Sequence, residues 1–313
     1  MVAAPICSIL IEWENALAAA DTRPGLVLRE LAAQASSTLL DGSWAELLVM
    51  YDPTRVDASQ LQSLIDSSLQ ASRGSLQWKV VAATDLHYYS MKNLGVKNAT
   101  GEYIIFLDSD VIPDHGWLSR VIEAMKDPKY SVLASSVYVD TDGFMNKVMG
   151  LIWVFDPVPQ TDKIVRVDRF RSNSVAIRRN LLEKYPFPEI PGRSRGSEFY
   201  LAMQMHHDGI YLYQHLGARL AHPRPIGKDT WAKAIAWGRD RELNEMQHGV
   251  LYYAVTRFLR AAKRVIIFRQ RVLLPSWQVP AALLMTLAFY LLFGVGGIAT
   301  KIAPKYMARH FLI

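Results

Sequence analysis

Short apolar runs alternate with amphipathic stretches along the first 126 residues of this chain. A strand that is buried on both faces of a sheet reads as a continuous apolar run, whereas apolar residues at helical spacing indicate one buried face of a helix. The predicted strands are Ile6–Ile11, Leu47–Tyr51, Gln77–Ala82 and Tyr103–Leu107. The predicted helices are Arg29–Leu40, Leu61–Leu69, Lys92–Asn98 (a short helix or a turn) and Trp117–Met125. This alternation predicts an α/β fold with a mostly parallel sheet, flanked by helices and wound with right-handed crossovers.

The middle of the chain has a less regular pattern. Two further strands are predicted over Val132–Val139 and Arg166–Ile177, and a helix over Ser197–His207. Before that helix, Pro186–Gly196 is rich in proline, glycine and arginine, which is typical of a mobile loop. The chain shows no internal repeat and no low-complexity tract. We expect the α/β domain to span residues 1–230.

Two carboxylates follow the predicted strand Tyr103–Leu107. Asp108 and Asp110 are separated by one residue and precede Pro113. In an open α/β sheet, ligands bind beyond the carboxyl ends of the strands. Carboxylates suit Mg²⁺ or Mn²⁺, which commonly bind through one or two of them together with substrate phosphates. The pattern therefore predicts a site for a divalent cation and a phosphorylated ligand, with simple capping of the turn as the alternative.

The C-terminal part of the chain changes character. Trp231–Phe268 is predicted to be helical and basic, with interleaved aromatic and aliphatic residues, as in helices that lie on a membrane surface. The alternative is an amphipathic helix packed on the domain. We expect this segment to cover residues 231–271. From Val272 to Thr300 no residue is charged, and Ala281–Ile298 is apolar over a length that suffices to cross a bilayer.

Residues 272–313 are therefore predicted to be a membrane-associated segment and tail. Trp277 lies at one end of the apolar stretch, where aromatic belts form. Lysine and arginine are denser before the stretch than after it, which predicts that the catalytic part lies at the cytoplasmic face of the cell membrane. Pro275 and Pro280 keep a re-entrant hairpin open as an alternative to a full span, and a buried helix is a third possibility.

The charge and cysteine content narrow the class of protein. The formal net charge of +6 favours acidic partners such as nucleotide phosphates or anionic lipids. Nucleic acid is not an expected partner, because the basic stretch adjoins the apolar segment and no nucleic-acid-binding motif is present. Cys7 is the single cysteine, so no intramolecular disulfide forms, which fits a reducing compartment. No signal peptide is predicted, because Glu12 and Glu14 interrupt the first apolar run.

Seven short motifs follow one another over residues 6–241. They are Ser8–Asn15, Glu46–Asp52, Lys92–Gly95 with Ala99–Glu102, Asp108–Asp110, Ser172–Arg179, Gly196–Leu201, and His222–Pro225 with Trp237–Arg239. Each motif is loose, but in this order they resemble those of the family 2 glycosyltransferases of the GT-A fold. Two departures stand out: Glu12 and Glu14 replace the usual proline and tyrosine of the first motif, and Ser197-Glu198 supplies one carboxylate where the family usually has two.

The resemblance implies a GT-A fold and an inverting transfer of a sugar from a nucleotide-sugar, either a UDP-sugar or a GDP-sugar. Asp110 is the first candidate for direct coordination of Mn²⁺ or Mg²⁺, and Asp108 shares the metal or holds the ribose. A divalent cation would stabilise the charge that grows on the departing nucleoside diphosphate. Glu198 matches the general base, and the helix N-terminus favours its charged form. The alternative for Glu198 is an ordinary acidic residue in the first turn of a helix.

Four further residues are candidates for contacts with the diphosphate. His222 is either a third metal ligand, a diphosphate contact or a structural histidine. Lys92 contacts the diphosphate or the ribose, unless it is a solvated helix lysine. Arg193 and Arg195 lie on the loop before Glu198, which could close over the diphosphate and exclude water. The alternative for both arginines is a solvated loop.

Recognition of the nucleobase is expected at the ends of the first two strands. Asp52 ends the second strand and is a candidate acceptor for a hydrogen bond from the base, with capping of the turn before Pro53 as the alternative. Glu12, Trp13 and Glu14 close the first strand at the same edge of the sheet. Trp13 either stacks on the base or belongs to the core.

The sequence thus predicts a membrane-associated, metal-dependent inverting glycosyltransferase. Its acceptor would carry a hydroxyl and belong to an envelope glycan, a lipid or a lipid-linked glycan at the cytoplasmic membrane surface. One alternative is a nucleotidyl- or phosphotransferase that uses the same edge of the sheet and the same metal. The other is a degenerate family member that binds a nucleotide-sugar at the membrane without catalysis.

Overall fold

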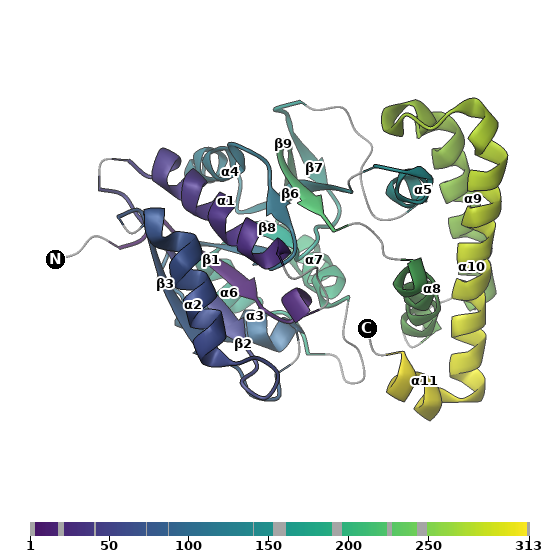
Figure 1. Cartoon of the computed structure of the whole chain (residues 1–313), viewed down its shortest axis with the longest axis horizontal. Coiled ribbons are helices and arrows are strands. Elements are labelled where there is room, and N and C mark those ends of the chain that lie inside the picture. Colours follow the sequence, from purple (N-terminus) through teal and green to yellow (C-terminus); the bar gives the residue numbers. More distant parts are fainter. Residues whose placement is uncertain are drawn as a thin grey trace. The chain divides into compact units, whose positions relative to one another are not determined.

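The computed structural model describes residues 4–17, 22–40, 42–72, 74–86, 88–139, 141–152, 161–189, 196–223, 227–242 and 249–311. The chain divides into two compact units (Figure 1). The first unit consists of Met1–Val137, Pro159–Ile190 and Arg195–His222. The second unit consists of Tyr138–Val158, Pro191–Ser194 and Pro223–Ile313.

The first unit is built around a mixed sheet whose first four strands along the chain run parallel. β1 (Cys7–Glu12) pairs with β2 (Ala45–Tyr51) on one side and with β4 (Tyr103–Asp108) on the other. β3 (Leu76–Ala82) extends the sheet beyond β2. Every residue of β1, β2 and β4 is buried, as expected for strands that are covered on both faces.

Beyond β4 the strand pairs are antiparallel. The order continues with β8 (Ser174–Arg178), β6 (Val132–Val139), β9 (Leu212–His222) and β5 (Ile112–Pro113), and β7 (Ile164–Val167) also pairs with β9. β8 is antiparallel to β4 and to β6, and β9 is antiparallel to β5 and to β7. Antiparallel neighbours need no helical crossover, so the alternation of strand and helix in the sequence fades after residue 126.

Three helices pack together on one face of this sheet (Figure 1). They are α1 (Arg23–Thr38), α2 (Ala58–Leu69) and α4 (Trp117–Lys126). The side chain of Asp57 caps α2 by accepting a hydrogen bond from the backbone N–H of Gln60 at 2.9 Å. Each of the three helices buries one apolar side against the strands, which explains the helical spacing seen in the sequence.

Three other helices contribute to the core on the opposite face. They are α3 (Tyr88–Asn98), α6 (Arg179–Lys184) and α7 (Ser197–His207). Their buried side chains form one cluster with Leu10 of β1 and Phe106 of β4. The helices α3 and α7 thereby reach the same edge of the sheet as the ends of β1 and β4.

Glu46 ties three strands together at the opposite, amino end of the sheet. The hydroxyls of Ser8 and Thr100 donate hydrogen bonds to its Oε1 at 2.5 and 2.8 Å, and the backbone N–H groups of Thr100 and Gly101 donate to the same atom. Gly101 is required here, because a Cβ on this residue would lie 2.5 Å from the backbone of Cys7. Burial raises the pKa of Glu46, but the hydrogen bonds from Ser8 and Thr100 outweigh it, so the net pKa is lowered.

The second unit is helical in its described residues. It contains α5 (Phe144–Ile152), α8 (Gly227–Glu242), α9 (Val250–Phe268), α10 (Val279–Ile302) and α11 (Pro304–His310). One apolar cluster joins buried residues of α5, α8, α9 and α10. Within the described part of the chain, one segment, Ser276–Ile302, is long and apolar enough to cross a membrane by length and composition, with a mean hydropathy of 2.1.

The predicted α/β class is confirmed, while several elements differ in detail. The stretch predicted as one strand over Arg166–Ile177 forms two strands, β7 and β8, because the polar residues between them form a turn and each strand pairs with a different neighbour. The predicted element Lys92–Asn98 is the C-terminal part of the longer helix α3. The predicted helical stretch Trp231–Phe268 lies in α8 and α9, with residues 243–248 outside the described range.

We expect Glu46→Gln to destabilise the protein by about 1–3 kcal/mol, because a buried hydrogen-bond acceptor for four donors is changed. The lowered pKa of Glu46 contributes stability that is present above the usual glutamate pKa and is lost as pH falls through the folded-state value. Denaturant unfolding at several pH values should therefore show a weaker acid dependence for the variant. Glu123→Gln, at a side chain that is 74% exposed, is the matched control, and an equal effect of both substitutions would contradict this role of Glu46.

Candidate functional site

The carboxyl ends of β1 and β4 bring two buried carboxyl groups together. Glu12 and Asp108 occupy paired positions of the two strands. The side-chain amide of Asn15 donates a hydrogen bond to Glu12 Oε1 at 2.7 Å and another to Asp108 Oδ2 at 3.1 Å. The backbone N–H groups of Glu14 and Asn15 donate to Glu12 Oε2 at 2.9 and 3.2 Å. Burial, reinforced by the charge of Asp108, raises the pKa of Glu12 well above its usual value.

Lys92 supplies the positive charge that compensates Asp108. It is fully buried, and its Nζ lies 3.0 Å from Asp108 Oδ1. The same ammonium group donates to the carbonyl oxygen of Ser172 at 3.1 Å and lies 4.4 Å from the centre of the Tyr88 ring. Removing one partner of such a buried pair leaves an uncompensated charge in a region of low dielectric. Lys92 of α3 therefore holds the carboxylate at the end of β4 in place.

Asp110 and His222 are brought to the same edge by Arg23, the first residue of α1. The guanidinium of Arg23 donates from Nε to the carbonyl oxygen of Asp110 at 2.5 Å and from Nη2 to the carbonyl oxygen of Ala221 at 2.7 Å. Ala221 pairs with Ile112, and His222 follows it at the end of β9. Arg23 thus joins the turn that carries Asp110 to the strand end that carries His222.

The donors at this edge fit a divalent cation. Both oxygens of Asp108 already accept hydrogen bonds from Tyr88, Lys92 and Asn15, whereas Asp110 is partly exposed in the turn. A carboxylate and an imidazole are donors that Mn²⁺ accepts. Among the described residues, no three His, Cys, Asp or Glu side chains group closely enough to hold a metal ion by themselves. Cations of this class complete their coordination with substrate phosphates and water, so Asp110 is the residue that fits direct coordination.

Two adjacent tyrosines of α3 hold the two candidate acidic groups of the site. The hydroxyl of Tyr88 donates a hydrogen bond to Asp108 Oδ1 at 2.6 Å, and the hydroxyl of Tyr89 donates to Glu198 Oε2. The two rings meet edge to face with their centres 4.8 Å apart. Burial, followed by the charges of neighbouring carboxylates, raises the pKa of both tyrosines well above the usual value, so both remain protonated donors.

Glu198 lies in the first turn of α7 and is only partly buried. Gly196, the N-cap of α7 two positions before Glu198, adopts a φ of +100°, which a glycine tolerates, and the backbone N–H of Gly196 donates to the Tyr89 hydroxyl at 3.3 Å. While Oε2 accepts the hydrogen bond from Tyr89, Oε1 accepts none from the described residues. Glu198 is therefore oriented by one oxygen while the other can accept a proton.

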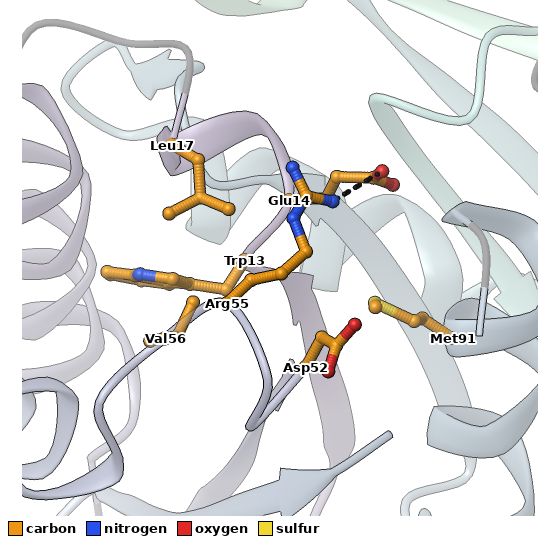
Figure 2. A pocket seen from close by; sticks show the side chains of 7 residues that line it. All are labelled: Trp13, Glu14, Leu17, Asp52, Arg55, Val56 and Met91. Atoms are coloured by element: carbon orange, nitrogen blue, oxygen red, sulfur yellow. Dashed lines mark hydrogen bonds and ion pairs between the residues drawn. The ribbon is translucent and has the colours of Figure 1, made fainter. Parts of the chain in front are cut away.

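A small pocket lies at the ends of β1 and β2 (Figure 2). It is lined by Trp13, Glu14, Leu17, Asp52, Arg55, Val56 and Met91. The pocket brings together three of the residues that the sequence predicted for base recognition, namely Trp13, Glu14 and Asp52. Figure 2 shows the flat indole of Trp13 beside the stem of Arg55, whose Nη1 lies 3.2 Å from Glu14 Oε1.

Asp52 supplies a hydrogen-bond acceptor to this pocket. Its Oδ1 accepts hydrogen bonds from the backbone N–H and the hydroxyl of Thr54 at 2.9 and 2.8 Å. The backbone N–H and then the hydroxyl of Thr54 lower the pKa of Asp52, so this group is a carboxylate at neutral pH. Asp52 Oδ2 accepts no hydrogen bond from the described residues.

Three residues that organise this edge could not be predicted as site residues from the sequence. Arg23, Tyr88 and Tyr89 were not among the predicted site residues, although Tyr88 precedes Lys92 by four positions, the spacing of neighbours on one helix face. Arg193 and Arg195 lie outside the described residues. The remaining predicted site residues all belong to the first unit.

Residues 63–186 match the family model described as glycosyl transferase family 2. The matched range includes Lys92, Asp108 and Asp110, and it ends before Glu198 and His222. No curated protein sequence matches the chain.

Solved glycosyltransferase structures share the fold at low sequence identity. A mannosyltransferase from Pyrobaculum calidifontis in complex with GDP-Man and Mn²⁺ aligns with a TM-score of 0.56 at 12% identity, over 96% of this chain and 88% of that one. Residues 1–349 of S. aureus TarS in complex with UDP-GlcNAc align with a TM-score of 0.50 at 13% identity, over 95% and 91% of the two chains. GalNAc-T7 with UDP, GalNAc and Mn²⁺ aligns with a TM-score of 0.52 at 15% identity, over 71% of this chain and only 44% of that one. These similarities confirm the predicted GT-A fold.

We expect Lys92→Met to destabilise the protein by about 3–5 kcal/mol, because it leaves the Asp108 carboxylate buried without its cation. Neutralising the partner in the double variant Lys92→Met/Asp108→Asn should restore a large part of the loss. Thermal and denaturant unfolding of the single and double variants measure both effects. Additive losses in the double variant would show that the two side chains do not interact in the folded protein.

Proposed function

We propose that this chain is a glycosyltransferase with a family 2 domain that uses a nucleotide-sugar. It would be an inverting, metal-dependent enzyme that acts on an acceptor hydroxyl at the cytoplasmic surface of a membrane. The observation that carries the proposal is the pair of adjacent tyrosines in α3. Through Tyr88 and Tyr89, one helix positions both Asp108, at the donor side, and Glu198, the candidate base. An inverting transfer needs these two groups at fixed positions on opposite sides of the sugar.

The donor would lie along the carboxyl ends of β1, β2 and β4. The pocket beside Trp13 would offer a flat ring and the Oδ2 of Asp52, which accepts no hydrogen bond from the described residues, to a nucleobase. Both uracil and guanine present N–H groups to such an acceptor. The diphosphate would extend from there toward the turn at Asp110. GDP-Man and UDP-GlcNAc occur in the solved relatives, which supports either a UDP-sugar or a GDP-sugar as the donor.

Asp110 would hold Mn²⁺ or Mg²⁺, assisted by Asp108 and His222. A divalent cation held at this place would stabilise the negative charge of the departing nucleoside diphosphate. The protein's own contribution is to fix the turn: Arg23 holds the carbonyl oxygen of Asp110, and Lys92 holds Asp108. The mannosyltransferase and GalNAc-T7 structures both contain Mn²⁺, which supports a metal in this enzyme as well.

Glu198 would act as the general base. Its Oε1, which accepts no hydrogen bond from the described residues, would take the proton of the acceptor hydroxyl while the hydroxyl oxygen forms a bond to the anomeric carbon. The bond from that carbon to the diphosphate oxygen breaks, and the nucleoside diphosphate leaves with the electron pair. Attack opposite the leaving group inverts the configuration. The apolar and basic second unit supports an acceptor that is a lipid, a lipid-linked glycan or an envelope glycan.

We expect Asp110→Ala to lower donor turnover at least about 100-fold, since the stabilisation of the leaving diphosphate is worth several kcal/mol. The measurement is the release of nucleoside diphosphate from a panel of UDP- and GDP-sugars, with Mn²⁺, Mg²⁺ or a chelator. The control is Asp114→Asn, at a partly exposed aspartate that lies between β5 and α4. Release of a nucleoside monophosphate would instead favour a nucleotidyl- or phosphotransferase. Donor binding without any turnover would favour a catalytically inactive binding protein.

Glu198→Gln should reduce kcat by about 10²–10⁴-fold while leaving donor affinity near that of the native enzyme, because the base acts on the acceptor and not on the donor.

Tyr89→Phe should reduce kcat by about tenfold or more, since it removes a hydrogen bond to a charged group. Steady-state kinetics and donor titration separate the two parameters. Tyr130→Phe, at a ring that packs edge-on against Tyr213, is the matched control. A purely structural role of Tyr89 would lower donor affinity and thermal stability together with kcat.

A further inference from the structure

The apolar helix α10 is bound along one side to a charged helix. A Cβ on Gly238 of α8 would lie 1.8 Å from the carbonyl oxygen of Phe293, and a Cβ on Gly296 would lie 2.0 Å from the carbonyl oxygen of Ile235. The two backbones therefore touch near the middle and C-terminal half of α10. The buried side of α10 includes Phe289 and Phe293, which belong to the apolar cluster of the second unit.

This packing is incompatible with a helix that crosses the bilayer on its own. At the contact, α8 carries Arg239 and Asp240, which pair with each other, and Arg241 and Glu242 follow directly. Lys301 of α10 pairs with Glu242 at 3.2 Å. If α10 crossed the bilayer in this arrangement, these charged residues of α8 would be carried into the hydrocarbon region, where charged side chains are costly. The packing of α8 against α10 and a transmembrane orientation of α10 therefore exclude each other.

The opposite side of α10 is a continuous apolar stripe that no part of the described chain covers. Its residues recur every three or four positions, as expected for one helix face. They are Leu284, Leu287, Leu291, Val295, Ile298 and Ile302, all exposed. The neighbouring helix α9 exposes a second stripe of the same kind, with Leu251, Val255, Leu259 and Ile266.

The two stripes adjoin each other. The methyl carbon Cδ2 of Leu251 lies 3.7 Å from the position of a Cβ on Gly294, and Gly294 is the neighbour of Val295 in the stripe of α10. The connection between the helices also projects apolar side chains, because Leu273 and Trp277 are each 78% exposed. Exposed apolar surface of this extent marks a binding site for a membrane or another protein.

The charges around the stripes identify the partner. Residues 246–313 contain no aspartate and no glutamate, whereas they contain nine lysines and arginines. Arg260 and Lys263 of α9 are exposed and form no ion pair with the described residues. Lys263 follows Leu259 by four positions and precedes Ile266 by three, so it lies on the exposed face itself. A second copy of this unit would bring cations against cations, while an anionic lipid surface would complement them.

We propose that α9 and α10 bind side-on to the surface of an anionic bilayer, with their two apolar stripes in the headgroup and upper acyl region and with Arg260 and Lys263 on lipid phosphates. The side chains of Trp277 and Leu273, in the connection between the two helices, insert into the headgroup region of the bilayer, which is the depth that tryptophan prefers. The binding is in the plane of the membrane and does not involve a spanning helix. This inference deepens the membrane location in the proposed function, and it holds or fails independently of the transfer chemistry.

The test uses the full chain and vesicles of phosphatidylcholine, alone or mixed with phosphatidylglycerol. Flotation should show binding that depends on phosphatidylglycerol, weakens with salt and is reversed by alkaline carbonate. Arg260→Gln/Lys263→Gln should weaken binding about 25-fold, since each cation near an anionic surface contributes about fivefold. Leu259→Asn/Leu291→Asn should weaken it at least about tenfold. The matched controls are Lys97→Gln/Lys126→Gln and Leu40→Asn, at exposed positions of the first unit.

Other outcomes overturn the proposal. Resistance to alkaline carbonate, with the C-terminal residues protected from protease, would show a spanning helix. Absence of vesicle binding, together with a dimer that dissociates in Leu259→Asn/Leu291→Asn, would show that a second copy covers the stripes. Turnover of soluble donor in detergent should stay unchanged in all of these variants, so a failure of docking is distinguished from a failure of the proposed chemistry.

Discussion

The ion pair between Lys92 and Asp108 is the constraint on which the active edge of this protein depends. Both side chains are buried, so each charge is stable in the folded protein only because the other is present. The pair fixes α3 against the end of β4, and it thereby fixes everything that α3 carries. The Asp108 carboxylate is held by Lys92, Tyr88 and Asn15, so it has little freedom to move when a ligand arrives.

From this fixed helix, two consecutive side chains reach two different carboxylates. Tyr88 holds Asp108 of β4, and Tyr89 holds Glu198 of α7, although Asp108 and Glu198 are 90 positions apart in the chain. Such an arrangement sets the distance between Asp108, at the end of β4, and Glu198 by the geometry of one rigid helix. The second unit follows a different principle, because its buried glycine contacts fix α8 against α10 and leave the apolar stripes outside.

The fold class could be predicted from the sequence because a strand that is buried on both faces has a continuous run of apolar residues. β1, β2 and β4 read as apolar runs, and Asp108 and Asp110 stand at the end of one of them, so the edge of the sheet and its chemistry could be located without a structure. The strand β9 could not be found in this way, because only some of its residues are fully buried and its polar residues interrupt the run. Its end nevertheless places His222 beside the turn, through a hydrogen bond from Arg23 that spans 198 positions.

The sequence by itself determined the α/β architecture, the family resemblance, the acidic turn and the apolar, acid-free C-terminal segment, since these depend on local order and composition. The tertiary structure decided the rest. It turned Lys92 from a candidate for phosphate contact into the buried partner of Asp108, assigned Tyr88 and Tyr89 to two carboxylates, and set α10 beside a charged helix. Hydropathy counts apolar residues along a helix but does not tell which side of the helix is already covered, and only the packing of α8 against α10 shows which side of α10 is buried and which is exposed.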